Sequence, residues 1–197
     1  MRCPPQDVLP MHSADLIVIG AGPAGMSAAR RAAELGLRVL ILDEQPAAGG
    51  QIYRNVDGAG AVRSDILGKD YTHGLTLTES LHHNNITHLK GAVVWQIEDG
   101  TRVAFTQNGA GALAVGQRIL LATGALERPM PLSGWTLPGV MTAGAAQILL
   151  KQSGIACHGA VLVGSGPLLY LIATQMVRAG VPPLALIETQ TTQDLTK

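Results

Sequence analysis

The sequence is short of charged and aromatic residues. Charged residues make up 14% of the 197 residues, well below the roughly 25% usual in soluble domains, and aromatic residues make up 3%. Lysine plus arginine and aspartate plus glutamate number 14 each, so the formal net charge is zero. Without a basic excess, the chain lacks the electrostatic footprint of a nucleic-acid-binding protein. With 47% hydrophobic residues it is also too apolar for an intrinsically disordered chain.

Cysteine is scarce as well: the two cysteines, Cys3 and Cys157, form no CxxC pair. The sequence therefore predicts neither a zinc site nor a dithiol redox centre, and the histidines show no metal-ligand spacing. Lone thiols are typical of a reducing compartment, and no apolar run typical of a secretory signal precedes Asp15, so we expect a cytoplasmic protein. Two uncharged stretches, Pro129–Leu150 and Gln152–Val177, are broken by glycine and proline, so we expect no membrane span.

Glycine, by contrast, is abundant, with 24 copies among 197 residues against an average near ~7%. Part of this excess lies in an internal repeat with an offset of 144 residues, from Gly20 to Gly164. In each copy a four-residue apolar run precedes a Gly-x-Gly-Pro turn, a helical stretch follows, and a second apolar run ends in Asp43 or Glu188. Such runs are typical of parallel strands covered by helices, so the repeat predicts two strand-helix-strand units.

The segments outside the repeat predict further helices and strands. We expect a helix at 71–85 and another near 143–151. Between them we expect a small antiparallel insertion with a hairpin turn at Asp99-Gly100. The strands of this insertion are expected at 92–97, 102–106 and 117–122.

These elements together predict an α/β fold. It consists of a Rossmann-like dinucleotide-binding domain with a small antiparallel β insertion, followed by the start of a second Rossmann-like domain. We place the domain boundary at Arg128. The first domain then takes residues 1–127, with an N-terminal tail at 1–14, and the incomplete second domain takes residues 128–197.

The first glycine turn, Gly20-Ala21-Gly22-Pro23-Ala24-Gly25, matches the dinucleotide-binding pattern G-x-G-x-x-G between a strand and a helix. The first glycine permits the turn, the second lets a pyrophosphate approach the backbone, and the third allows close helix packing. The helix N-terminus offers N–H groups to the phosphates, and Asp43 is placed to accept from ribose hydroxyls. A glycine turn without a ligand is the alternative, and the adjacent Glu44 fits an ordinary solvated acid equally well.

Further motifs extend this pattern: Gly20–Gly25, Asp43–Gln45, Gly49–Arg54, Ala122–Gly124 and Glu127–Leu132. With them the sequence resembles the FAD- and NAD(P)-dependent oxidoreductases with two dinucleotide-binding domains. Within that family the resemblance is to opine oxidase A subunits, hydrogen cyanide synthase B subunits and related amino-acid dehydrogenase subunits. It runs over nearly the whole chain and implies FAD at the first site, so the first domain is expected to be an FAD-binding domain.

The resemblance also implies which segments surround the FAD. Gly50-Gln51 would lie along the diphosphate and the flavin side, and the backbone at Val93-Val94 would meet the adenine. Ala122-Thr123-Gly124 would close over the middle of the cofactor. A plain loop at the two glycines and plain strand-end chemistry at Thr123-Gly124 are the alternatives. The expected FAD-site residues are Gly20, Gly22, Pro23, Ala24, Gly25, Asp43, Glu44, Gln45, Gly50, Gln51, Val93, Val94, Ala122, Thr123 and Gly124.

The second glycine turn departs from the pattern, because Leu169 stands where the third glycine would be. That glycine serves helix packing, so we expect Leu169 to push the helix outward. Gly164, Gly166 and Glu188 remain candidates for nucleotide binding, and the Glu188 carboxylate would repel a 2′-phosphate. The expected ligand is NAD or another adenine nucleotide. A vestigial, purely structural second unit is an equal alternative.

The resemblance implies an FAD-binding oxidoreductase that passes electrons from the oxidation of an opine, imino acid or related amine. The chain ends at Lys197, before the segments that complete the second domain and the flavin surroundings in the resembling family. We therefore expect a truncated product, a fragment, or a subunit completed by another oxidoreductase subunit or by self-association, and inactive alone. No catalytic residue is identified. The alternative is a nucleotide-binding or structural remnant without independent catalysis.

Overall fold

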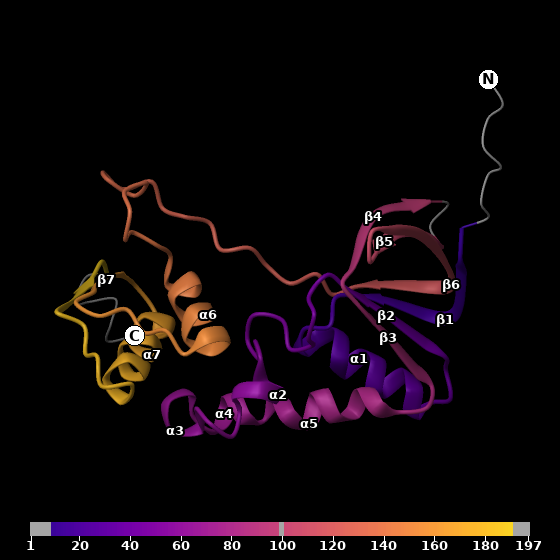
Figure 1. The fold of residues 1–197 in the computed structure, drawn as a ribbon, viewed down its shortest axis with the longest axis horizontal. Helices are drawn as coiled ribbons and strands as arrows, with labels where there is room; N and C mark the ends of the chain where they lie inside the picture. Colours follow the sequence, from indigo (N-terminus) through magenta and orange to yellow (C-terminus); the bar gives the residue numbers. More distant parts are fainter. Residues whose placement is uncertain (1–8, 99–100, 191–197) are drawn as a thin grey trace. The chain divides into compact units, whose positions relative to one another are not determined.

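The structure, a computed structural model, describes residues 9–98 and 101–190. The chain divides into two compact units, whose elements are labelled in Figure 1. The first unit consists of the residues up to Tyr53 together with His73–Gly124. The second consists of Arg54–Thr72 together with the residues from Ala125 onward. The segment 54–72 thus groups with the C-terminal part of the chain, although most of the first unit follows it in sequence.

The first unit is built on a mixed six-stranded sheet with the order β3-β2-β1-β6-β5-β4. Strands β3, β2, β1 and β6 run parallel to their neighbours, whereas β6, β5 and β4 are joined antiparallel. This arrangement confirms the α/β fold with an antiparallel insertion. The strands are β1 (Met11–Ile19), β2 (Val39–Asp43), β3 (Ile86–Lys90), β4 (Ala92–Glu98), β5 (Arg102–Gln107) and β6 (Ala110–Leu121).

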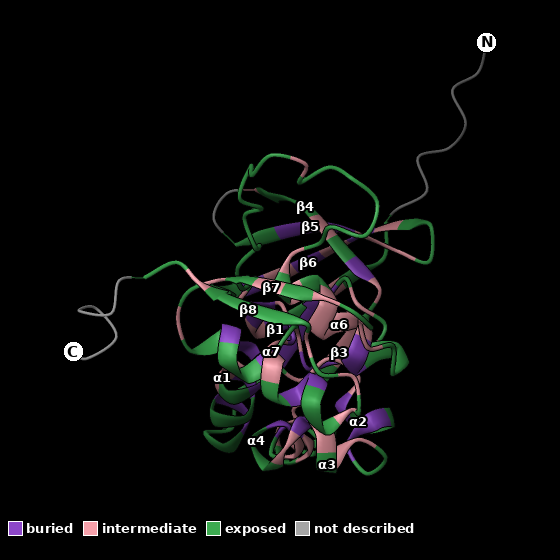
Figure 2. Cartoon of the chain, turned by 90° about the vertical axis from the view of Figure 1, so that its left-hand side faces the viewer, coloured by how far each residue is buried: buried purple, intermediate pink, exposed green. Residues whose placement is uncertain are grey.

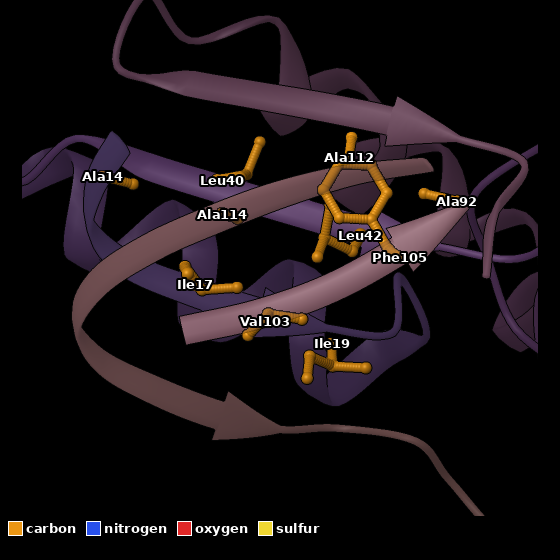
Figure 3. Packing of buried hydrophobic residues seen from close by; sticks show 10 residues of the cluster. All are labelled: Ala14, Ile17, Ile19, Leu40, Leu42, Ala92, Val103, Phe105, Ala112 and Ala114. Carbon is orange, nitrogen blue, oxygen red and sulfur yellow. The ribbon is translucent and has the colours of Figure 1, made fainter. Parts of the chain in front are cut away.

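The two faces of this sheet carry separate cores, because successive side chains of β1 and β2 point to opposite faces. On one face, alanines of helix α1 (Pro23–Glu34) and Met26 pack against Val18 and Ile41. The small alanine side chains let the helix lie close to the sheet. On the other face, β5 and β6 fold over the parallel strands and place the Phe105 ring near Leu42 (Figure 3). Each core is therefore formed mainly by segments predicted from the repeat and the insertion.

Two elements of the first unit differ from the expectation. The helix expected at 71–85 occurs as three short pieces that end at His82: α4 (Lys69–Thr72), α5 (Gly74–Glu79) and η1 (Ser80–His82). The expectation for its last three residues is wrong because His83 turns to extended backbone and its Nδ1 accepts from the Asn85 N–H at 3.1 Å. The chain then enters β3, a parallel edge strand that we did not predict.

The antiparallel insertion also turns at a site that we did not predict. Strand β6 begins at Ala110, earlier than the expected strand at 117–122, and a tight turn joins it to β5. Asn108 and Gly109 adopt positive φ angles of 51° and 80°, as a two-residue hairpin turn requires. The turn expected at Asp99-Gly100 lies outside the described residues.

The second unit contains a parallel pair, β7 (Val161–Gly164) and β8 (Ala185–Glu188), joined by helix α7 (Pro167–Arg178). Helix α6 (Ala143–Ser153) packs beside α7, and the short helices α2 (Val56–Ala59) and α3 (Ser64–Leu67) complete the unit. Much of β8 is exposed, as Figure 2 shows by its colour. The predicted second strand-helix-strand unit is thus present.

Candidate functional site

The first glycine turn lies where β1 ends, directly beside the end of β6. Gly20 has φ +105°, and a Cβ built there would lie 2.4 Å from the Ala122 carbonyl oxygen. A side chain at this position would therefore meet backbone that cannot move without disturbing the sheet. The turn and the end of β6 share one edge, since the Ala122 N–H donates to the Ile19 carbonyl at 2.8 Å. The structure thus brings together two segments that were expected to surround the cofactor.

The other two glycines of the turn have different surroundings. A Cβ on Gly25 would lie 2.0 Å from the Gly20 carbonyl oxygen, so the close approach of α1 to β1 depends on glycine here. A Cβ on Gly22 would have the Gly50 Cα, at 3.9 Å, as its nearest atom. The space above Gly22 is therefore open, as a backbone that receives a pyrophosphate requires.

A second glycine segment, Gly49-Gly50, lies against this turn. The Gly49 N–H donates to the Ala21 carbonyl at 2.8 Å. A Cβ on Gly50 would lie 2.9 Å from the Gly22 Cα, and Gly50 itself has φ +59°. Two glycines on different segments thus face each other across a space bounded by backbone, which favours a cofactor-binding cradle over a plain loop.

Helix α1 begins at this cradle without a side-chain cap. Its N-cap residue is Gly22, Pro23 follows in the first turn, and no acidic side chain lies in that turn. By contrast, α6 is capped by the Thr142 hydroxyl, which accepts from the Ala145 N–H at 3.3 Å. The uncapped N–H groups and the positive dipole end of α1 form a donor set that fits an anionic group such as a diphosphate.

The acid at the end of β2 lies at the same edge. Asp43 is only 6% exposed. One of its carboxylate oxygens accepts from the Ala21 N–H of the glycine turn, and the other accepts from the Gln45 N–H at 2.7 Å. Glu44, the next residue, is exposed. The two neighbouring acids therefore have quite different environments.

The remaining candidates of the first site lie around this edge of the sheet. Strand β4 begins close to Gln45, whose carbonyl accepts from the Gly91 N–H at 3.2 Å. Along β4, Val93 is exposed and the half-buried Val94 packs against the core beneath the insertion. Thr123 and Gly124 follow β6 and are exposed. The structure thus places the predicted adenine and closing segments in the same unit as the turn.

The second glycine turn lies in the other unit, between β7 and α7. Gly164 pairs with Glu188 across the two strands, and the Gly164 carbonyl accepts from the Thr189 N–H at 2.9 Å. Leu169 is 5% exposed, and its Cδ1 would lie 3.8 Å from a Cβ on Gly164. Helix α7 therefore leaves room for a leucine where α1 leaves none for a methyl group. Like α1, α7 has a glycine N-cap, Gly166, and no side-chain cap.

Tyr170 is a residue of this second site that the sequence reasoning missed. Its hydroxyl donates to Glu188 Oε2 at 2.9 Å, and Glu188 Oε1 accepts from the Gln190 N–H at 2.9 Å. The Gln190 N–H, followed by the Tyr170 hydroxyl, lowers the pKa of the Glu188 carboxyl, and the same carboxylate raises the pKa of the Tyr170 phenol. Tyr170 stands one position after Leu169, so only the internal repeat could have drawn attention to it.

His88 is a second residue with unusual surroundings. It lies on β3 opposite Ile41 of β2, and its Nε2 is buried without a hydrogen-bond partner. Burial lowers the pKa of His88, against the attraction of Asp43. Residues 9–98 and 101–190 contain no group of three His, Cys, Asp or Glu side chains that could hold a metal ion. The same residues contain no helix that is both long enough and apolar enough to cross a membrane.

Comparison with curated proteins identifies relatives that are much longer than this chain. It is 49% identical over 184 residues to the opine oxidase A-type subunit of Agrobacterium tumefaciens (strain Ach5). It is 37% identical over 172 residues to the hydrogen cyanide synthase subunit HcnB of Pseudomonas aeruginosa. These alignments cover 89% and 84% of this chain but 37% and 36% of the relatives, so the chain spans about a third of their length. The alpha subunit of sarcosine oxidase from Corynebacterium sp. (strain P-1) is 34% identical over 168 residues, which are 77% of this chain and 17% of that protein.

Among solved structures, L-proline dehydrogenase from P. horikoshii has the same fold. The TM-score is 0.75 at 20% identity, over 92% of this chain and 37% of that one. The sequence profile of the family described as pyridine nucleotide-disulphide oxidoreductase matches residues 14–192. That range contains both glycine turns and both acids that follow them. The chain therefore belongs to the pyridine nucleotide-disulphide oxidoreductase family.

Proposed function

We propose that this chain provides the FAD-binding part of an oxidoreductase subunit that acts on an opine, imino acid or related amine. The observation that carries the proposal is the cradle between Gly22 and Gly50, where the backbone leaves open space beside an uncapped helix N-terminus. A diphosphate fits this donor set, and a structural remnant without a ligand has no need of it. Bound FAD would supply the redox chemistry, by accepting the electrons of the oxidised amine.

The residues of the chain would bind and orient this cofactor. The N–H groups at Ala24 and Gly25, in the first turn of α1, would donate to the diphosphate beside Gly22 and Pro23. Acids at the end of β2 would hold the adenosine ribose. Gln51 would lie toward the flavin, the backbone of Val93 and Val94 toward the adenine, and the segment 122–124 over the middle of the cofactor. The first unit then combines the predicted FAD-site residues on one edge of its sheet.

The substrate class and the partner are proposed from the relatives. Their names include opine oxidase and sarcosine oxidase, and both opines and sarcosine are amino-acid derivatives with a substituted amine. All three relatives are named as subunits, which supports a partner that is itself a second oxidoreductase subunit. We place the substrate site with that partner or with further parts of a longer chain, because the described residues offer no evident acid–base pair beside the cradle.

For the second glycine turn we propose NAD or another adenine nucleotide. Gly164 and Gly166 would face the phosphates, and the carboxylate of Glu188 would accept from ribose hydroxyls while repelling a 2′-phosphate. The uncapped N-terminus of α7 supports this assignment, as it does for α1. We also propose the domain boundary at Arg128, with residues 1–127 forming the FAD-binding domain and 128–197 belonging to the second dinucleotide-binding domain.

The test of the first site is Gly22→Val. The new side chain has room in the folded protein but fills the space that the diphosphate would use, so we expect at least ~100-fold weaker FAD binding with little change in melting temperature. Flavin fluorescence titration measures the affinity and circular dichroism the melting. The control is Gly36→Ala at the far end of α1, where nothing lies within 4 Å. Unchanged FAD affinity in Gly22→Val would refute the site.

A further inference from the structure

The two acids after β2 do not have equal access to a ligand. Asp43 is 6% exposed, and each of its carboxylate oxygens already accepts a backbone N–H. One of these donors, Ala21, belongs to the glycine turn, so the carboxylate ties the end of β2 to the turn. The Gly20 N–H reinforces the same connection by donating to the Leu42 carbonyl at 2.8 Å. Asp43 thus determines where the turn lies.

Glu44 has the opposite character. It is exposed, and its Oε1 accepts from the Gln45 side-chain amide at 3.1 Å. A hydrogen bond between exposed neighbouring side chains is readily exchanged for one to a ligand, because water already competes for both groups. The Glu44 carboxylate is therefore available to the hydroxyls of a ribose bound beside the turn, whereas the carboxylate of Asp43 is already engaged.

The second copy of the repeat shows what a longer side chain does at this position. Glu188 accepts from the N–H two residues later, Gln190, as Asp43 does from Gln45. Its other oxygen reaches the Tyr170 hydroxyl of α7, whereas in Asp43 that oxygen binds the turn. The aspartate, which is one methylene shorter, stays close to the turn backbone. Side-chain length thus separates an acid that holds the turn from one that extends toward the helix.

We propose that Glu44 binds the ribose hydroxyls of the adenine nucleotide at the first site, and that Asp43 is a positioning residue that holds the glycine turn. This inference rests on the proposed function, since it needs an adenine nucleotide in the first turn. It reverses the expectation that Asp43 makes the ribose contact. Removing Glu44 should cost only the hydroxyl contacts, whereas altering Asp43 should displace the backbone that binds the phosphates.

The experiment compares ADP with 2′,3′-dideoxy-ADP, which lacks both hydroxyls. Each nucleotide displaces FAD from the chain, and flavin fluorescence reports the displacement, so that only the first site is measured. In the wild type, loss of the hydroxyls should weaken binding about tenfold, as expected for a hydrogen bond to a charged group. In Glu44→Ala, ADP should bind about tenfold more weakly while dideoxy-ADP is unchanged, so that the two affinities become equal.

Asp43→Asn should behave differently. One amide N–H would face a backbone N–H, so the turn should shift and both nucleotides should weaken by the same factor, with the tenfold ratio kept. Its control is Asp15→Asn, because Asp15 also accepts a backbone N–H, that of Arg38 at 2.8 Å, but at the opposite end of the sheet. The control should lower the melting temperature and leave both affinities unchanged.

The outcomes separate the inference from the proposed function. A ratio that becomes one in Asp43→Asn, or that stays tenfold in Glu44→Ala, would overturn the inference while leaving the FAD site intact. If Asp43→Asn does not fold, Glu44→Ala alone decides, because an exposed side chain can be truncated without disturbing the core. Absence of FAD binding to the wild-type chain would overturn both the proposed function and the inference.

Discussion

Lys151 is the buried charge whose removal gives the clearest stability prediction. It lies on α6 and is 4% exposed, its Nζ donates to Gln147 Oε1 at 3.0 Å and it lies 5.8 Å from the centre of the Tyr71 ring. Burial, followed by repulsion from Arg54, lowers the pKa of Lys151 from 10.5 to about 8. The folded protein therefore carries a protonated lysine at neutral pH at a cost in stability, and Lys151→Met removes that charge while keeping most of the side-chain volume.

The magnitude follows from the linkage between pKa and folding. A shift from 10.5 to about 8 corresponds to an upper value of about 3 kcal/mol, at roughly 1.4 kcal/mol per unit. Relaxation and water near the ammonium reduce this figure, and the variant also loses the hydrogen bond to Gln147, worth about 1 kcal/mol. We therefore expect Lys151→Met to be more stable than the wild type by about 1 kcal/mol at pH 7.

The pH dependence gives the sign of the effect. Because the folded pKa lies below the unfolded one, the penalty is fully present below about pH 8 and disappears as the pH rises toward 10.5. Tyr71, whose pKa burial raises to about 12, stays protonated over this range. Urea unfolding of both proteins at pH 7, 9 and 10 measures the difference. A variant that is less stable at pH 7, or a difference that does not change with pH, would refute the reasoning.

Two further predictions concern the glycine turns and their acids. Gly25→Ala should destabilise the protein by about 3 kcal/mol in urea unfolding, because its methyl group would overlap the Gly20 carbonyl oxygen. Gly36→Ala, with φ +86° but open space, should cost about 1 kcal/mol, and equal effects would contradict the packing argument. Glu188→Gln should lower the pKa of the Tyr170 phenol toward its ordinary value, since the hydrogen bond to Glu188 is the first cause of its elevation. Tyrosinate absorption during an alkaline titration measures this, and an unchanged curve would exclude the Tyr170–Glu188 contact.

The first site was largely predictable because its parts are local in sequence. A turn of three glycines between an apolar strand and a helix allows few backbone arrangements, so the roles of Gly20, Gly22 and Gly25 could be assigned before the structure was known. The Asn108-Gly109 turn was equally local and carries a strong hairpin signal, yet we preferred Asp99-Gly100. That error came from reading the pattern incompletely, since the information was present in the sequence.

Other features depend on contacts between distant segments. Strand β3 is recognisable as a strand only once it pairs with β2, because its alternation of apolar and polar residues is short. The grouping of residues 54–72 with α6 depends on long-range bonds, such as that from Arg63 to the Lys151 carbonyl at 2.8 Å. The burial of Lys151 follows from the same packing, and no local pattern marks a helical lysine as buried.

The sequence alone determined the two strand-turn-helix-strand units, the α/β class and the glycines that a dinucleotide site requires, because each depends on residues close together in the chain. Only the tertiary structure decided how the two acids after β2 differ. Adjacent carboxylates are equivalent in a sequence pattern, but folding encloses Asp43 between two backbone N–H groups and leaves Glu44 exposed. Burial and hydrogen bonding are properties of the packed chain, and they determine which of two neighbouring acids can meet a ligand.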